Sequence, residues 1–284
     1  MARERSGPNF AHVVLATRLR ILRKAAGLSP QQAADALGAH GDTVRRIEQA
    51  KTSLDAGQVH TLLTAYGAGA EEIEDFLGKL SAASLPGWWH PWRAVMDTWQ
   101  RDLMSVESAA RIIRIWEPAL VPALLRTPAY ARALDEALRP DLAPAEMEQR
   151  TELLMARQER LRAQRTRIWA LMSASALHTR VGGEEVMAEQ RKVLRAEAER
   201  PGLTLQIHPL TGPPHALTGI PALTLYRVES PEIPDRMVRE AGPVGTADVW
   251  DTDTAATTVT NYRLLMDSSS TRAPHPDTSK EALE

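Results

Sequence analysis

Apolar positions at the start of the chain recur at helical spacing. Between residues 11 and 26 they are separated by steps of four and three, which places them on one face of a helix. They are Ala11, Leu15, Leu19, Leu22 and Ala26. Gly27 is the residue type that commonly ends a helix, and Ser29 followed by Pro30 has the preferences of an N-cap and a first helical position. The pattern therefore predicts one amphipathic helix and the beginning of a second.

Four further short helices are predicted before residue 84. They span about residues 30–37, 40–50, 55–66 and 70–83. Gly38 separates the first two of these helices, and Val44 and Ile47 are expected to face inward from the second. The sequence thus predicts a mainly α N-terminal domain of five helices over residues 10–83.

The pattern changes after this region. Residues 84–93 contain Pro and Gly, which interrupt helices and are typical of a boundary. Helices are then expected over most of 94–117, from Thr127 to before Pro140, and at 144–165, 184–199 and 252–267, with strands at 168–171, 203–207, 222–228 and within 234–250. These elements predict an α+β C-terminal domain with a small β-sheet over residues 84–267. Residues 268–284 are rich in Ser, Thr and Pro and are expected to form a disordered tail.

Charge is distributed unevenly along the chain. The formal net charge is only −2, but residues 1–55 contain nine basic and five acidic side chains, so this stretch carries +4 and the remainder −6. A basic end joined to an acidic body fits a domain that faces DNA.

The second and third predicted helices fit a helix-turn-helix, in which two short helices cross closely through a tight turn. Ala33, Ala34 and Leu37 supply a small inward face, as close packing requires. The outward face of the third helix suits the major groove, where Arg can read guanine. We expect bases to be read by Gly41, Asp42, Thr43, Arg45 and Gln49, beside His40, and phosphates to be bound by Gln31, Gln32, Arg46 and Lys51. Glu48, on the inward side of this helix, is interpreted as structural, orienting a neighbouring Arg.

The stretch LRILRKAAGLSPQQAADALGAHGDTVRRIEQAK resembles the helix-turn-helix of phage-repressor-like (XRE-type) regulators. The matching pieces are LRxLRxxxGLS, AxxLG and TVxRIE. The resemblance implies a transcriptional regulator that binds double-stranded DNA as a homodimer. The chain departs from the family at two positions. Pro30 replaces a Gln that usually touches the DNA backbone, so that contact is either missing or shifted to Gln31. His40, followed by Gly41, replaces the usual Ser or Thr cap and is a poorer one.

The remainder of the chain resembles the body of WhiJ-like regulators, in WEPALVPALLRTPAYARAL, RVGGEEVMAEQ, LTLQIHPL and the closing helix. That resemblance implies antitoxin-like regulation in which the C-terminal domain binds a small companion protein encoded nearby. Two other interpretations stay open. One is a small-molecule effector, which predicts an apolar pocket with a few polar groups. The other is an enzyme, which we do not expect because the sequence shows no nucleophile, phosphate-loop or metal motif.

Other side chains narrow the class of protein. The chain has no Cys and eight scattered His without zinc-ligand spacing, so no metal and no cofactor are expected. No secretory signal and no membrane-length apolar run are visible, which predicts a cytoplasmic protein that does not enter a membrane.

Two clusters allow more than one interpretation. The Arg-rich helix at 150–167 is interpreted as a solvated or partner-binding helix, since acids share it, and a nucleic-acid face is the alternative. The cluster of Trp88, Trp89 and Trp92 is interpreted as a packed junction between the domains, with a ligand cage as the alternative.

Overall fold

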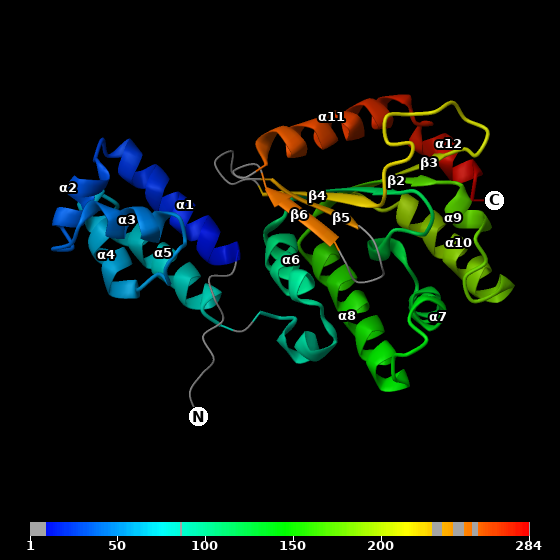
Figure 1. The fold of residues 1–284 in the computed structure, drawn as a ribbon, viewed down its shortest axis with the longest axis horizontal. Coiled ribbons are helices and arrows are strands. Elements are labelled where there is room, and N and C mark those ends of the chain that lie inside the picture. Colours follow the sequence, from blue (N-terminus) through cyan, green and yellow to red (C-terminus); the bar gives the residue numbers. More distant parts are fainter. Residues whose placement is uncertain (1–9, 86, 229–234, 241–246, 252–254, 284) are drawn as a thin grey trace. The chain divides into compact units, whose positions relative to one another are not determined.

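The computed structural model describes residues 10–85, 87–228, 235–240, 247–251 and 255–283 (Figure 1). The chain divides into two compact units. The first is Met1–His90 with Asp102–Ala109, and the second is Pro91–Arg101 with Ala110–Glu284.

The first unit is helical, as the hydrophobic pattern predicted. Its helices are α1 (Phe10–Ala25), α2 (Pro30–Asp35), α3 (Gly41–Glu48), α4 (Ala56–Ala65) and α5 (Ala70–Ala83). Their inward faces share one core, in which Leu19, Val44, Leu62 and Leu63 are fully buried. Burial of this kind stabilises helices that are individually too short to persist in water.

Local signals in the sequence set the ends of these helices. The Ser29 hydroxyl accepts a hydrogen bond from the Gln32 backbone N–H at 3.2 Å, and the Ser29 N–H donates to Gln32 Oε1 at 2.9 Å. This reciprocal pair is a capping box, which satisfies two backbone donors at the start of α2. Gly27 and Gly38 have φ of +71° and +59°, the left-handed conformation that lets the chain turn sharply between helices.

The second unit is built on a six-stranded mixed sheet in the order β3-β2-β1-β4-β5-β6. The strands are β1 (Ile112–Glu117), β2 (Arg167–Ser173), β3 (Leu203–His208), β4 (Leu223–Arg227), β5 (Arg236–Glu240) and β6 (Ala247–Asp251). Strands β1, β2 and β3 are parallel, and β4, β5 and β6 extend the sheet with antiparallel pairings. The sheet is therefore larger than the small one that the sequence predicted, although the combination of helices with a sheet is confirmed.

Helices cover both faces of this sheet (Figure 1). On one side lie α7 (Pro128–Leu138), α8 (Pro144–Ala163) and α10 (Glu184–Ala198), and on the other lies α11 (Ala256–Arg272). Helix α12 (Pro276–Glu281) lies beside the edge strand β3. The remaining elements are α6 (Thr98–Ala109), α9 (Ser175–His178) and 3₁₀ helices at His90–Val95 and Ala123–Leu125.

Strand β1 corrects the expectation that residues 94–117 are mostly helical. Ile113 and Ile115 are buried on one side of the strand, and Trp116 is buried in the core on the side of α11. A strand that is covered on both faces has no polar alternation, so its apolar run is hard to tell from a helical segment in the sequence.

The expectation of a disordered tail at residues 268–284 is also wrong over the part that the structure describes. Helix α11 continues to Arg272, and α12 lies against β3. The Ser279 hydroxyl accepts a hydrogen bond from the Ile207 N–H at 2.9 Å, and Leu283 is fully buried. The polar residues of this segment are ordered because they satisfy the backbone of an edge strand, which composition alone does not reveal.

Candidate nucleic-acid interface

Helix α3 separates its side chains into a buried and an exposed set. Val44, Ile47 and Glu48 are buried in the first unit, whereas Asp42, Arg45, Arg46 and Gln49 are exposed. The inward positions of Val44 and Ile47 agree with the prediction. The helix thus presents a polar, arginine-containing face of the kind that reads base edges in the major groove.

Asp42 and Arg45 form an ion pair on this exposed face. Arg45 Nη1 lies 2.5 Å from Asp42 Oδ1, and both side chains are well exposed. Asp42 therefore holds the guanidinium through Nη1. Because Arg45 has five N–H donors and no described hydrogen bond uses Nε or Nη2, those groups can donate to guanine while the pair with Asp42 is kept.

The two expected phosphate ligands on α2 are occupied within the domain. Gln31 Oε1 accepts from the Gly41 backbone N–H at 3.0 Å, and Gln31 Nε2 donates to Asp35 at 3.0 Å. Gln32 Oε1 accepts from Ser29 in the capping box. Each amide nitrogen has two N–H groups. Hydrogen bonds with described residues use neither N–H of Gln32 Nε2 and one of the two on Gln31 Nε2.

The start of α3 is capped from a neighbouring helix. His40 occupies the N-cap but its side chain makes no capping bond, so it is the poorer cap that the sequence suggested. Gln31 replaces it by accepting from Gly41. A side chain on Gly41 would place its Cβ 3.1 Å from Gln31 Oε1 and 3.3 Å from the Gln31 backbone nitrogen. A Cβ there would crowd Gln31, so Gly41 favours the close approach of α2 and α3, and because it is buried it offers little surface to DNA.

A buried ion pair ties α3 to α1. Arg23 Nε and Nη2 donate to the two carboxylate oxygens of Glu48 at 2.7 and 2.9 Å, and Arg23 Nη1 donates to Leu28 O at 2.6 Å. The Tyr66 hydroxyl donates to Glu48 Oε1 at 3.3 Å. The bond to Glu48 raises the pKa of Arg23, and burial is the main cause that raises the pKa of Tyr66. The structural interpretation of Glu48 is confirmed.

Sequence reasoning did not single out Arg23 and Tyr66 as the partners of Glu48. Arg23 was counted only among the basic residues of the N-terminal stretch. Its position four residues after Leu19, on the same inward face of α1, indicates that it is buried, and a charged side chain on such a face needs a partner.

The remaining predicted residues lie around the exposed face of α3. His40 is exposed at its start, Thr43 is half-buried, and Lys51 is exposed just beyond its end. Neither Arg46 nor Lys51 forms an ion pair with a residue that the structure describes. Their charges are thus available to an external anion.

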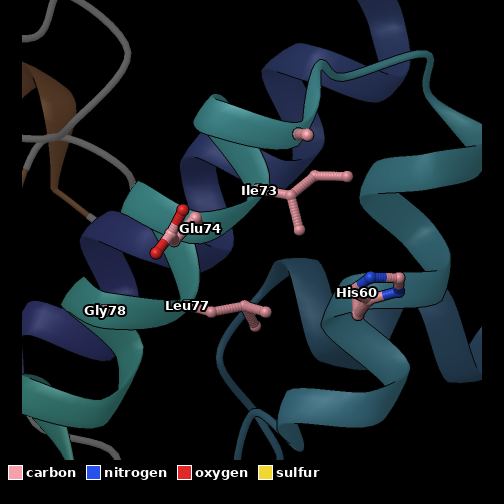
Figure 2. Close-up of a pocket in the computed structure, with 6 residues that line it drawn as sticks. His60, Ile73, Glu74, Leu77 and Gly78 are labelled. Atoms are coloured by element: carbon pink, nitrogen blue, oxygen red, sulfur yellow. The ribbon is translucent and has the colours of Figure 1, made fainter.

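A shallow groove lies between α4 and α5 in the same unit (Figure 2). It has a volume of about 480 Å³ and is lined by His60, Ala70, Ile73, Glu74, Leu77 and Gly78. Ile73 and Leu77 point toward His60 across it, whereas Glu74 points away (Figure 2). The groove is open and mostly apolar, and it belongs to the helical unit. The small-molecule interpretation, in contrast, expected a pocket in the second unit.

The tryptophans of residues 88–92 have structural partners. Trp88 packs edge-on against Trp89, and its indole N–H donates to Ser108 Oγ at 2.9 Å. The Trp92 indole N–H donates to Glu152 Oε2 at 3.2 Å. These contacts give at least two of the three indoles a packing role.

The described ranges lack the features that two other kinds of site would need. No three His, Asp or Glu side chains gather there in a way that would hold a metal ion. In the same residues, no helix combines the length and hydropathy that a membrane span needs.

Two families match the chain. A helix-turn-helix domain matches residues 14–76, which includes α2, α3 and the ion pair between Arg23 and Glu48. A domain of unknown function (DUF5753) matches residues 100–284, about two thirds of the chain. The chain belongs to this second family. No curated protein and no solved structure matches it. The helix-turn-helix match supports a DNA-binding regulator, and the DUF5753 match assigns no activity to the second unit.

Proposed function

We propose that this member of the DUF5753 family is a sequence-specific transcriptional regulator of the XRE type that acts without a catalytic step. The observation that carries the proposal is α3, which is held from within by the pair of Glu48 with Arg23 and presents Arg45, Arg46 and Gln49 outward inside a helix-turn-helix match. A rigidly supported helix with exposed Arg is what major-groove reading requires.

The proposed contacts follow from where each side chain lies. Arg45 and Gln49, with Asp42 and Thr43, read bases, and Arg46 and Lys51 bind phosphates, whereas Gly41 is too buried to take part. Gln32 can donate to a phosphate through both N–H groups of its amide nitrogen, whereas Gln31 has one N–H left after its bond to Asp35. Residues 10–83 form the DNA-binding part of the proposal, and the regulator binds as a homodimer on a pseudo-palindromic site.

The second unit is proposed to bind a small companion protein encoded nearby, in an antitoxin-like arrangement. The support is the resemblance of residues 116–134 and the later segments to WhiJ-like regulators. We place the regulatory part at about residues 84–267 and the whole protein in the cytoplasm.

The test is a binding titration of the full chain with the DNA upstream of its own gene. It is made at two salt concentrations, with and without the product of the neighbouring small gene. Sequence-preferring binding that weakens with salt supports the regulator, and a shift caused by the companion supports the role of the second unit. Binding that is equal on all sequences, or absent, contradicts the proposal. DNA binding that is indifferent to the companion contradicts only the companion and leaves a small-molecule effector to be tested.

A further inference from the structure

A group of arginines gathers at one end of the sheet in the second unit, far along the chain from the helix-turn-helix. The Arg167 N–H donates to Arg111 O at 2.9 Å, and the Ile168 N–H donates to Gly202 O at 2.8 Å. These bonds place the start of β1, the turn from α8 into β2 and the turn from α10 into β3 side by side. The Arg-rich segment at 150–167 therefore runs from helix α8 into the start of β2, at one end of the sheet.

The turn from α8 into β2 is fixed in place. Arg165 adopts φ of +54°, and the next residue, Thr166, is 1% exposed. The Thr166 hydroxyl donates to Ala110 O at 3.3 Å, which ties the turn to the residue that precedes Arg111. Arg165 and Arg167, on either side of this buried threonine, are both exposed.

Five arginines belong to the segments that meet at this end of the sheet, which we call the arginine edge. It consists of Arg111, Arg162, Arg165, Arg167 and Arg200. Glu197 is shared between two of them, accepting from Arg162 at 3.0 Å and from Arg200 at 2.7 Å. The neighbouring Glu199 pairs instead with Lys280 at 2.8 Å. Arg165 and Arg167 form no ion pair with any residue in the described ranges.

The chemistry of the arginine edge favours a polyanion. Guanidinium groups bind phosphate oxygens through two parallel N–H bonds, and several close arginines repel each other unless an anion lies between them. Protein interfaces, in contrast, usually bury a large apolar or aromatic centre. Among the described residues, the large apolar side chains left exposed are Leu85, Leu138, Leu210, Val249 and Leu264, and none belongs to the segments that form this edge.

We propose that the arginine edge binds the phosphates of duplex DNA as a second, sequence-independent contact. This inference rests on the proposed function, because it assumes that the chain is brought to DNA. It gives the second unit a role in affinity that is separate from any companion or effector.

The test compares salt dependence in the full chain. Binding to a duplex of about 60 base pairs that contains the upstream region is measured by fluorescence anisotropy between 50 and 200 mM salt. The variant is Arg165→Gln with Arg167→Gln. The matched control is Arg180→Gln with Arg272→Gln, which removes two exposed arginines of the same unit that form no described ion pair. Circular dichroism checks that both variants are folded.

Each phosphate contact contributes roughly −0.9 to the slope of log affinity against log salt. We expect the Arg165/Arg167 variant to lose a slope of about 1.8, so that the wild type weakens about tenfold more than this variant over the fourfold change in salt. The control should keep the wild-type slope. An unchanged slope in the Arg165/Arg167 variant, or an equal loss in the control, overturns the arginine edge as a DNA contact and would leave an acidic protein as its partner.

A third variant separates this inference from the proposed function. Arg46→Gln with Lys51→Gln removes phosphate contacts of the helix-turn-helix. If it weakens binding and the Arg165/Arg167 variant does not, only the arginine edge is overturned. If the Arg165/Arg167 variant weakens binding while the helix-turn-helix variant does not, the role of α3 is overturned and the edge stands. If the wild type does not bind the duplex, both fail.

Discussion

Arg45 is the residue on which the proposed reading of bases depends most directly. Its guanidinium is exposed and held by Asp42 through Nη1, so its other N–H groups can donate to a base edge while the pair is kept. Asp42 is therefore expected to orient Arg45 even if it never touches DNA. The neighbouring Arg46 is exposed without such a restraint and suits a phosphate, which needs less exact geometry.

Replacing Arg45 with Ala should weaken specific binding by about 1–3 kcal/mol and relax the preference at one base position, since a bidentate contact to guanine is lost. Competition binding with a set of single-base variants of the site measures both effects. An equal loss of affinity on every sequence would show that Arg45 contacts phosphate instead.

Glu48 acts on stability rather than on DNA. The Glu48→Gln variant leaves Arg23 buried without its counter-charge, and removing one partner of a buried pair typically costs about 3–5 kcal/mol. Urea unfolding of the helical unit measures the change. Glu72→Gln is the control, because its pair with Arg18 is 3.5 Å long and exposed, and such pairs contribute about 1 kcal/mol or less. Equal effects of the two variants would contradict the role assigned to Glu48.

At the scale of elements, the contact between α2 and α3 determines how the recognition helix begins. Capping by Gln31, the close approach at Gly41 and the capping box at Ser29 belong to one contiguous set of bonds. The position of α3 therefore depends on α2 more than on its own N-cap residue.

Replacing Gln31 with Ala should lower the free energy of unfolding by about 1 kcal/mol, because the Gly41 N–H loses its acceptor at the start of α3. Gln58→Ala, at an exposed position on α4, is the matched control and should change stability little. Chemical denaturation measures both variants. Adding His40→Ser to the Gln31→Ala variant should restore stability, because Ser supplies a side-chain cap. If stability is not restored, the capping role of Gln31 is contradicted.

The loop after β3 provides an element with a pH dependence. His215 packs edge-on against Trp116, 4.8 Å between ring centroids, and lies 4.3 Å from His208. Burial, followed by the charge of His208, lowers the pKa of His215. Its Nδ1 lies 3.2 Å from the Leu217 N–H and can accept from it only when unprotonated.

Because the folded-state pKa of His215 lies below its ordinary value of 6.5, the unfolded chain takes up a proton first as the pH falls. The stability of the second unit should thus be complete above about pH 6.5 and decrease below it. Urea unfolding between pH 5 and 8 measures this, and His215→Gln should flatten the profile. If the His215→Gln variant loses as much stability at low pH as the wild type, the loss comes from other titratable groups.

At the scale of the whole molecule, the chain consists of two units with separate cores. The helical unit is held by its own apolar cluster and the Arg23–Glu48 pair, and the second unit by the two-sided burial of a mixed sheet. This organisation permits one unit to bind DNA while the other responds to a second signal.

Two cores should give more than one unfolding transition in calorimetry of the full chain, because two-state behaviour holds for single domains. Glu48→Gln should lower the midpoint of one transition and leave the other in place. A single transition that shifts as a whole would show that the units unfold together.

Much of the helical unit follows from local sequence. The spacing of Leu15, Leu19 and Leu22, the capping box at Ser29 and the glycines at 27 and 38 act over a few residues, so their consequences can be read without the fold. The exposed face of α3 follows from the same periodicity, and with it most of the candidate interface. The partners of Glu48 were harder to identify, because Arg23 and Tyr66 lie 25 and 18 residues away along the chain.

Only the tertiary structure decided the contacts between segments that are distant along the chain. Each of these contacts joins residues that no local pattern relates. Gln31 accepts a hydrogen bond from Gly41, β1 is buried on both faces, α12 packs against β3, and arginines from separate segments meet at one end of the sheet. Periodicity specifies which face of an element is apolar, but it does not specify which element covers that face. The sequence by itself therefore determined the helices of the DNA-binding part and its polar face, and the fold decided which of those polar groups remain free to bind.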